Sequence, residues 1–284
     1  MKKLESKNII VTGGSLGIGF AISKKIASEG GTVIMIARNT SDLIIATNKL
    51  EELYNSHHYY YPVDISNIHE IEIFKNSIKN KFENIHGLVN CAGIYGPIGK
   101  TTTINTDDFL DTIKINLMGT IYMCSMFTNL NSSNNKRKIV NFSGGGAATP
   151  FANYSAYATS KTAIVRLTEN LSIELNDANI DVNCVAPGFV NTRLHNNTIK
   201  AGPDNAGQNF FENTKKQIEN GSVPPEKAAD LTSFLLSDDS NGITGKFISA
   251  PWDSWQDEDF QKLLREDKDF ATLRRIDNKT FFKK

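Results

Sequence analysis

Three kinds of feature are scarce in this sequence, and each scarcity excludes a class of protein. Cysteine occurs 3 times in 284 residues, at distant positions, which excludes a disulfide framework and the paired spacing of a zinc site. Lysine plus arginine and aspartate plus glutamate both number 31, so no cationic surface for a nucleic acid is expected. No apolar run approaches the roughly 20 residues of a membrane span, and the first residues lack the apolar core of a secretory signal. We therefore expect reduced thiols, no metal site and a cytoplasmic protein with neither nucleic-acid nor membrane partners.

The apolar residues that are present follow a regular order along the chain. A chain of 284 residues can bury one large core, and 39% hydrophobic residues are ordinary for a globular protein. Short apolar runs predict strands at residues 8–12, 32–37, 59–63, 87–90, 138–142, 181–185 and 245–249. Helical patterns lie between them, such as 17–30 and 68–82. Strict alternation of the two predicts a single α/β domain, with a doubly wound parallel sheet of about seven strands and helices on both faces.

A glycine-rich turn joins the first predicted strand to the first predicted helix. In VTGGSLGIG, residues 11–19, glycine stands at positions where a tight turn leaves no room for a Cβ atom, Gly13, Gly17 and Gly19. A helix that starts there directs free N–H groups and the positive end of its dipole toward a ligand, which suits a pyrophosphate. Such a turn can also bind nothing, but as the first turn of a βαβ unit it predicts dinucleotide binding.

Later segments predict the rest of the nucleotide site. The second strand is followed by Arg38, where an acidic residue would select NAD; an arginine can pair with a 2′-phosphate, so NADP is favoured and NAD stays possible. Arg38 could also be a plain surface charge. Asp64, after the third strand, could bond the adenine edge or only cap the next turn. Asn90 to Gly93 ends the fourth strand and lets the backbone approach a cofactor closely.

Two tyrosines and one lysine share the segment FANYSAYATSK, residues 151–161. Tyr157 and Lys161 have the i, i+4 spacing that places both side chains on one helix face. A phenol, with an unperturbed pKa near ~10, is a weak acid at neutral pH, and a neighbouring ammonium is expected to lower that pKa. Tyr154 lies two turns from Lys161 and is expected to pack or to line a pocket. The spacing is also common in purely structural helices, but it makes Tyr157 the candidate acid–base residue.

Two further polar residues precede this pair. Ser143 ends the fifth strand, at the sheet edge where doubly wound folds bind ligands, and its hydroxyl could bond a substrate carbonyl. Asn116 lies inside a predicted helix, where an amide without a local partner is unfavourable. It could hold a water molecule behind Lys161, or it could be a satisfied amide that bends the helix.

Taken in order, these motifs resemble those of the short-chain dehydrogenase/reductase family over about residues 5–250. The resemblance implies a Rossmann fold, an NAD(P) cofactor and a catalytic tetrad of Asn116, Ser143, Tyr157 and Lys161. It implies that Tyr157 protonates the carbonyl oxygen, that Lys161 also bonds the nicotinamide ribose and that Ser143 orients the substrate. The positions that match cofactor contacts, the two catalytic residues included, are Gly13, Ser15, Leu16, Gly17, Ile18, Gly19, Arg38, Asp64, Ile65, Asn90, Ala92, Gly93, Tyr157, Lys161, Pro187, Gly188, Val190 and Thr192.

Three positions depart from the family pattern. Cys91 replaces the usual second asparagine, a change between small residues. Leu16 stands where many NADP-preferring members have a basic residue, which leaves Arg38 to bind the 2′-phosphate alone. Ser143 and Tyr157 are separated by one residue more than is commonest, and the glycines at 144–146 could absorb it as a bulge.

Residues 189–224, here the lid segment, stand where the family has a mobile substrate lid. The segment is rich in polar residues, namely Arg193, His195, Asn196, Asn197, Lys200 and Asn209. A polar lid suits a hydroxylated or phosphate-bearing substrate, although exposed loops are commonly polar in any case. We predict a dehydrogenase domain over residues 1–250 that includes this lid, followed by a C-terminal extension over 251–284.

The extension carries many large apolar groups for a chain terminus, Trp252, Trp255, Phe260, Leu263, Leu264, Phe270, Leu273, Phe281 and Phe282. Each gains roughly 1.5–3 kcal/mol on burial, so a frayed tail is not expected. The extension is predicted to pack on its own domain or across a subunit interface. The family resemblance implies a homodimer or homotetramer that pairs through helices near 105–128 and 156–175.

The function predicted from the sequence is oxidoreduction between a carbonyl and a secondary alcohol, on a polar, sugar-like small molecule. A 3-oxoacyl thioester is the alternative substrate. A nucleotide-binding scaffold without turnover is the alternative of another class, and the intact tetrad weighs against it.

Overall fold

The structure, a computed structural model, describes residues 2–130 and 135–275. Its centre is a seven-stranded sheet in the order β3-β2-β1-β4-β5-β6-β7, and every neighbouring pair of strands is parallel. The strands are β1 (Asn8–Thr12), β2 (Thr32–Ala37), β3 (Tyr59–Pro62), β4 (Gly87–Asn90), β5 (Arg137–Phe142), β6 (Ile180–Ala186) and β7 (Phe247–Ser249). The predicted doubly wound Rossmann fold is confirmed.

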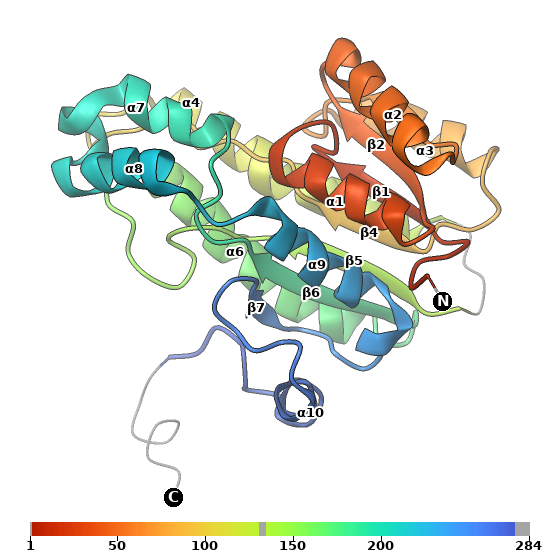
Figure 1. Cartoon of the computed structure of the whole chain (residues 1–284). Helices are drawn as coiled ribbons and strands as arrows, with labels where there is room; N and C mark the ends of the chain where they lie inside the picture. Colours follow the sequence, from red (N-terminus) through yellow and green to blue (C-terminus); the bar gives the residue numbers. More distant parts are fainter. Residues whose placement is uncertain (1, 131–134, 276–284) are drawn as a thin grey trace, which may run out of the picture.

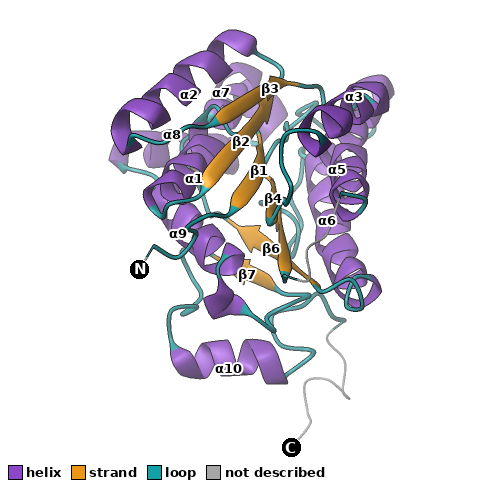
Figure 2. Cartoon of the chain, turned by 90° about the vertical axis from the view of Figure 1, so that its right-hand side faces the viewer, coloured by secondary structure: helices purple, strands orange, loops and turns teal. Residues whose placement is uncertain are grey.

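Helices cover both faces of the sheet (Figures 1 and 2). One face carries α1 (Gly17–Ser28), α2 (Thr40–Tyr54) and α9 (Pro225–Leu236). The other carries α3 (Ile68–Lys79), α5 (Gly119–Thr128) and α6 (Ser155–Glu174). The remaining elements are α4 (Thr106–Ile113), the π-helical turn η1 (Lys114–Met118), α7 (Arg193–Ala206), α8 (Gln208–Asn220), the short 3₁₀ turn η2 (Asp238–Ser240) and α10 (Glu258–Glu266).

Consecutive side chains of the central strand β1 pack into two separate hydrophobic cores, one on each face of the sheet. Ile9 and Val11 pack with α1, α2 and α9, whereas Ile10 between them packs with α3 and α5. All three side chains are at most 1% exposed. A strand that is buried on both faces has no polar alternation, which is why β1 appears in the sequence as a continuous apolar run.

Most element ends lie within a few residues of their predicted positions, and local contacts explain the differences. β6 is one residue longer at each end than predicted, because Ile180 pairs with Arg137 and Ala186 with Ser249. β7 starts at Phe247 rather than at Gly245, whose φ of +74° belongs to a turn. The first helix ends at Ser28, two residues earlier than predicted, because Gly30 has a φ of +85° and cannot continue the helix.

The order of the strands determines where a ligand can bind. The chain runs outward from β1 to β2 and β3, then returns to the other side of β1 with β4. The loops after β1 and β4 therefore diverge and leave a crevice at the carboxyl edge of the sheet. The loops after β5 and β6 reach the same edge, since all strands are parallel.

The segment after β7 folds back against the domain, below β7 in Figure 1. Trp255 and Leu264 lie in the same core as α9, and the rings of Trp255 and Phe234 are 5.6 Å apart. The β7 residue Phe247 donates its backbone N–H to the Ala271 carbonyl, so the extension covers the outer edge of β7. Trp252 is 79% exposed. Phe281 and Phe282 lie outside the described residues.

A buried cation and a buried anion bind this segment to the domain. Lys246, 4% exposed, donates to the carbonyls of Asp267 and Phe270 at 2.6 and 3.0 Å. Glu169, on α6, accepts from Arg274 at 2.9 Å and from the backbone N–H of Leu273 at 2.7 Å. The extension thus supplies the hydrogen-bond partners of the buried Lys246 ammonium and adds to those of Glu169, which also pairs with Arg166 on α6.

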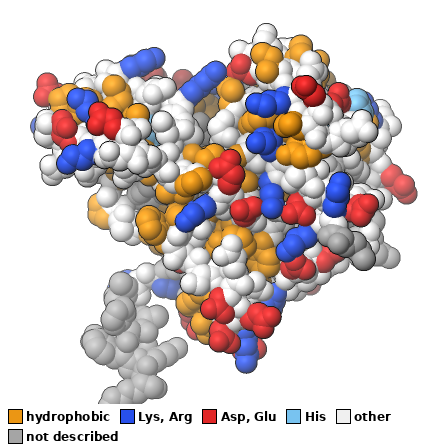
Figure 3. All heavy atoms as spheres, viewed as in Figure 1, with side chains coloured by type: hydrophobic (Ala, Val, Ile, Leu, Met, Phe, Trp, Pro, Cys, Tyr) orange, Lys and Arg blue, Asp and Glu red, His pale blue; other side chains and the backbone are white. Residues whose placement is uncertain are grey.

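Charges of both signs are interspersed over the face shown in Figure 3. This mixture agrees with the zero net charge of the sequence. In the described part of the chain, no helix is both long and apolar enough to cross a membrane.

A buried histidine, His58, and a partly buried one, His86, replace carbonyls as hydrogen-bond acceptors at the start of the sheet. The Nδ1 atom of His86 accepts the Asn8 N–H at 3.0 Å, and that of His58 accepts the Val33 N–H at 3.2 Å. Burial lowers the pKa of both imidazoles, so the folded chain binds fewer protons than the unfolded chain. The contribution of these two histidines to the free energy of unfolding should be fully present above the unfolded pKa of about 6.5. It should be lost as the pH drops through their lowered pKa values in the folded chain.

Denaturant midpoints at about pH 7.5 and pH 5 measure this loss. Asparagine can supply an acceptor near the Nδ1 position without titrating, so His58→Asn and His86→Asn should each reduce the loss. The exposed His69, changed to Asn, is the matched control and should lose as much stability as the wild type. Equal losses of stability in the wild type and the three variants would show that neither His58 nor His86 causes the loss at low pH.

Candidate active site

The turn between β1 and α1 leaves space for a ligand beside its backbone. Gly13 and Gly17 have positive φ values of 67° and 53°, which favour glycine. A Cβ atom on Gly19 would lie 2.1 Å from the Gly13 carbonyl oxygen, so no side chain fits there. Leu16, the residue before α1, makes no side-chain hydrogen bond to the N–H groups of the first turn, and the first turn of α1, which the structure describes in full, contains no acidic residue. The N-terminal N–H groups of α1 are therefore available to an anion, and the turn fits a dinucleotide pyrophosphate.

The loop after β4 is fastened to this turn. Thr12 Oγ1 accepts the backbone N–H groups of Cys91 and Ala92, both at 3.1 Å. A Cβ atom on Gly13 would approach the Ala92 Cα to 3.1 Å, so the two loops are in close contact. Asn90 is buried and donates to the Asn141 side chain at 2.9 Å, which joins the ends of β4 and β5.

The remaining predicted cofactor contacts border the same crevice at different depths. Ser15 is buried, Ile18 is half-buried and Leu16 is exposed. Arg38, which was predicted to bind a 2′-phosphate, is exposed and has no ion pair within the described residues. Asp64 accepts the Ser66 N–H at 2.9 Å and the Ser66 hydroxyl at 2.7 Å, which supports the turn-capping interpretation of this residue.

The loop after β6 approaches the pyrophosphate turn from the other side. Thr192 lies against Gly17, since its Cγ2 would be 3.4 Å from a Cβ atom placed there. Pro187 and Val190 are buried, and Gly188 has a φ of +77°. Ile65, from the loop after β3, is buried against Gly119 at the start of α5.

Tyr157 and Lys161 emerge from α6 beneath the loop after β5. Tyr157 is 7% exposed, and its hydroxyl would be 2.0 Å from a Cβ atom on Gly144. Gly144 therefore provides the space that the phenol hydroxyl occupies, a function that the spacing of the glycine run does not reveal. The extra residue of this loop forms a turn in which the Ala147 N–H donates to the Gly144 carbonyl at 3.3 Å, with Gly146 at a φ of +85°.

The pKa of the Tyr157 phenol shifts in the direction opposite to the one expected from the neighbouring Lys161. Burial raises the pKa of the Tyr157 phenol, and the neighbouring Cys91 thiol acts in the same direction. The Lys161 ammonium donates to the Phe142 carbonyl at 2.8 Å and lies 5.7 Å from the centre of the Tyr157 ring. Burial also lowers the pKa of Lys161, because the cation is removed from water.

Asn116, a member of the predicted tetrad, lies with Lys161 beside Gly93 in the loop after β4. Asn116 Oδ1 accepts the Ile94 N–H at 2.9 Å, while its Nδ2 donates to the Ile94 carbonyl at 2.9 Å and to Ser160 Oγ at 3.0 Å. The side chain is thus a satisfied amide in the π-helical turn η1, as one of the two interpretations predicted. A Cβ atom on Gly93 would lie 3.2 Å from Asn116 Oδ1 and 3.4 Å from Lys161 Nζ, so this loop passes directly over both residues.

Ser143 has a buried hydroxyl that lacks a bond. The residue is 3% exposed, and its Oγ has no hydrogen-bond partner within the described part of the chain. The thiol of Cys184 is its polar neighbour. Burial raises the pKa of that thiol to about 12, and the Ser143 hydroxyl and backbone N–H oppose this rise from positions without full hydrogen-bond geometry. A buried hydroxyl without a partner costs about 1–3 kcal/mol, so Ser143 Oγ is available for a hydrogen bond to a ligand.

A cluster of aromatic residues surrounds Tyr157, and sequence reasoning missed one of its central members. The rings of Tyr95 and Tyr157 meet edge to face with centres 4.8 Å apart. Tyr154, which is fully buried, donates to Thr198 Oγ1 at 2.9 Å and stacks on Phe151 at 4.3 Å. The packing interpretation of Tyr154 agrees with these contacts. No local motif identifies Tyr95, which lies two residues after Gly93.

The lid segment turns a different side toward the site than its composition indicated. Its polar residues Arg193, Asn196, Asn197, Lys200 and Asn209 are all exposed, and among the six residues that suggested a polar lid only His195 is buried. Phe210 and Phe211 pack instead with the tyrosine cluster. Five of the six residues that suggested a polar lid thus face solvent, because α7 and α8 are amphipathic and present a polar face to solvent. A polar substrate stays a prediction.

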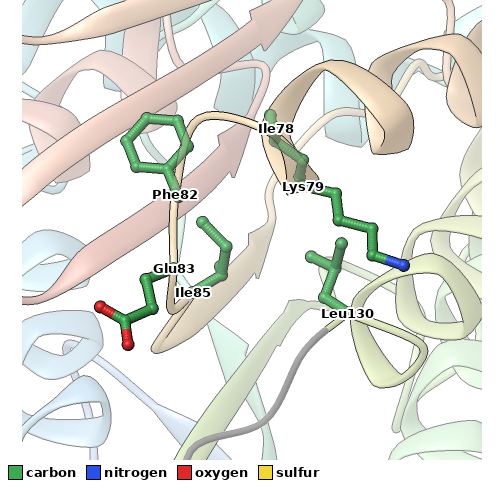
Figure 4. Close-up of a pocket in the computed structure, with 6 residues that line it drawn as sticks. All are labelled: Ile78, Lys79, Phe82, Glu83, Ile85 and Leu130. Atoms are coloured by element: carbon green, nitrogen blue, oxygen red, sulfur yellow. The ribbon is translucent and has the colours of Figure 1, made fainter.

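A small hollow lies at the opposite edge of the sheet (Figure 4). It is lined by Ile78, Lys79, Phe82, Glu83, Ile85 and Leu130, and β4 begins just after it, at the amino end of the strands. Its volume of about 10 Å³ is close to the minimum for one water molecule. We therefore assign no ligand to it.

The fold and this carboxyl-edge site define an NAD(P)-linked oxidoreductase of the Rossmann type. A sequence model described as short chain dehydrogenase matches residues 7–202, more than half of the chain, and the protein belongs to this family. It is an oxidoreductase that acts on a carbonyl or an alcohol.

Individual relatives cover nearly the whole chain. The sequence is 31% identical to a 3-oxoacyl-(acyl-carrier-protein) reductase of Chlamydia trachomatis over 87% of this chain and 96% of the relative. It is 32% identical to carbonyl reductase family member 4 of Xenopus laevis, over 86% and 95% of the two chains. Among solved structures, NAD⁺-bound xylitol dehydrogenase superposes with a TM-score of 0.80 at 25% identity, covering 87% of this chain and 98% of the other.

Proposed function

We propose that this protein interconverts a small uncharged carbonyl compound and its secondary alcohol, with NADP(H) as the preferred cofactor. The observation that carries the proposal is the convergence of Ser143, Tyr157 and Lys161, all less than 8% exposed, at the edge that holds the glycine turn. When bound, the nicotinamide supplies or accepts the hydride. NADPH oxidation against a panel of ketones tests the proposal directly.

The residues of the site divide the proton chemistry among them. Tyr157 donates a proton to the carbonyl oxygen during reduction, and its raised pKa keeps the phenol in the protonated form that can donate. Ser143 Oγ, which lacks a bond, donates to the same oxygen and orients it. The Lys161 ammonium has three N–H donors and uses one for Phe142, so two remain for a ribose hydroxyl and for a path that returns the proton.

Cofactor preference is proposed to depend on Arg38. The exposed guanidinium follows β2, and Asp42, in the first turn of α2, is engaged by Arg193 at 3.5 Å. Arg38→Asp removes a cation and adds an anion where the 2′-phosphate would bind. The ratio of the dissociation constants for NADH and NADPH should fall by about tenfold to a hundredfold, since a charge-assisted bond contributes about 1.5–3 kcal/mol.

Fluorescence titration of both cofactors measures this ratio without turnover. The matched control is Lys262→Asp, which makes the same charge change on the exposed side of α10 and should leave the ratio unchanged. A wild type that binds NADH as tightly as NADPH, with no response to Arg38→Asp, would refute the preference.

The contacts of the lid narrow the proposed substrate. Every lysine and arginine of the lid segment is exposed, so within the described residues no buried cation of the lid is available to a phosphate. This removes the support for a phosphate-bearing substrate. A hydroxylated, sugar-like carbonyl compound remains, and the likeness to a xylitol dehydrogenase supports it. A 3-oxoacyl thioester is the second candidate, favoured by the likeness to the 3-oxoacyl reductase of Chlamydia trachomatis.

Assembly as a homodimer or homotetramer is proposed through the helices near 105–128 and 156–175. Leu110 on α4 and Ile173 on α6 are 63% and 78% exposed, and a subunit contact would bury them.

A further inference from the structure

A buried polar pair lies next to the proposed tetrad without belonging to it. Tyr95 Oη and His195 Nε2 are hydrogen-bonded at 3.1 Å. Tyr95 comes from the loop after β4 and is 4% exposed, while His195 comes from α7 in the lid segment and is 7% exposed. The pair therefore joins the lid to the floor of the site.

The Tyr95 ring lies between His195 and the candidate acid Tyr157. The Tyr95 ring contacts the Tyr157 ring at 4.8 Å and the His195 ring at 5.8 Å. The other side of His195 contacts Phe189 at 3.8 Å. A substrate whose carbonyl oxygen binds at Tyr157 would extend past Tyr95 toward His195.

One nitrogen of His195 has no bond. Its Nδ1 is buried and has no partner of hydrogen-bonding geometry in the described residues. Burial lowers the pKa of His195 to about 4, and a hydrogen-bonding interaction of the Val190 backbone with the ring opposes this shift. The imidazole is therefore neutral near pH 7 and has one donor and one acceptor nitrogen.

We propose that His195 is a specificity residue, which binds a second, uncharged oxygen of the substrate through Nδ1 while Tyr95 holds the imidazole ring in place. The proposal rests on the proposed function and names the substrate class for it: a ketone with a further hydroxyl or keto group. If Tyr95 donates to Nε2, then Nδ1 carries a proton and donates to that oxygen. If Nε2 donates to Tyr95, then Nδ1 accepts from a hydroxyl, so a hydroxyl suits both arrangements.

The test compares two ketones that differ by one hydroxyl group, α-hydroxyacetophenone and acetophenone. The measured quantity is the ratio of their kcat/KM values with NADPH. The two ketones differ in intrinsic reactivity, but this difference is the same for every enzyme variant and cancels when the ratios of two variants are compared. His195→Phe keeps a ring against Tyr95 and Phe189 but removes both nitrogens. We expect it to lower the ratio about tenfold, the effect of one lost hydrogen bond with an unpaired buried group.

Three further variants separate recognition from packing. Asparagine places its amide near the Nδ1 position and glutamine near Nε2, so His195→Asn should keep most of the ratio whereas His195→Gln should lose it. Tyr154→Phe removes the bond to Thr198, which lies on the same helix, and should change both ketones alike. A ratio unchanged in His195→Phe, or lowered equally in Tyr154→Phe, would overturn the proposal.

A binding measurement keeps this inference separate from the proposed function. Calorimetry on Tyr157→Phe with NADPH present should show tighter binding of the hydroxy ketone, and addition of His195→Phe should remove that preference. If wild type turned over neither ketone while the binding preference followed His195, the proposed function would fail for these compounds and the recognition would stand. If turnover occurred and neither ratio responded to His195, only the recognition would fail.

Discussion

Replacing Tyr157 with phenylalanine is expected to lower kcat/KM by about a hundredfold to ten-thousandfold, the range typical of a lost general acid. The ring contact with Tyr95 at 4.8 Å does not involve the hydroxyl, and the space beside Gly144 is left rather than filled. The fold and the glycine turn are therefore unaffected, and the dissociation constant for NADPH should change little. Steady-state kinetics together with cofactor titration separate the two effects.

The control for this prediction is the other tyrosine of the same segment. Tyr154→Phe removes a hydroxyl that is bonded to Thr198 and not directed at the reacting group, so activity should fall only modestly. If Tyr157→Phe kept near wild-type turnover while Tyr154→Phe was inactive, the proton donor would be Tyr154 and the assignment to Tyr157 would be wrong.

Deleting residues 252–284 is expected to lower the melting temperature by about 10 °C or more, or to prevent folding. Trp255 and Leu264, 8% and 1% exposed, would be lost from the core beneath α9. At roughly 1.5–3 kcal/mol each, their burial is a large share of the 5–15 kcal/mol that holds a typical domain folded. The deletion would also leave the Lys246 ammonium without the carbonyls of Asp267 and Phe270.

Two tryptophans of the extension provide a matched comparison in the full-length chain. Trp255→Ala should cost about 3–5 kcal/mol, because it empties a buried site. Trp252 is 79% exposed, and Trp252→Ala should cost little. Light scattering on the same proteins measures whether the extension also affects assembly. A truncated chain with unchanged melting temperature and activity would show that these contacts do not stabilise the domain.

The fold could be predicted from the sequence because its signals are local. Each buried strand is a short apolar run, each helix has a 3.6-residue period, and their alternation permits few topologies. The glycine turn and the tyrosine–lysine pair are also local, since a tight turn and one helix face depend on neighbours in sequence. Element ends were less predictable, because a strand such as β6 ends where its partners end.

The environment of the site could not be predicted in the same way. The sequence places Lys161 one turn from Tyr157 and implies a lowered phenol pKa. The folded chain surrounds both with protein, and removal of water raises the pKa of the phenol instead. Desolvation depends on everything packed around a group, including loops that are distant in sequence.

The sequence by itself determined the Rossmann class, the position of the glycine turn and the order of the four candidate catalytic residues, because each rests on a pattern within a few residues. Only the tertiary structure decided that Gly144 makes room for the Tyr157 hydroxyl and that His195, a hundred residues from Tyr95, is bonded to it. It also decided that five of the six residues that suggested a polar lid, all except His195, face solvent. Composition counts the side chains of a helix, but the surface against which the helix packs determines which of them are buried.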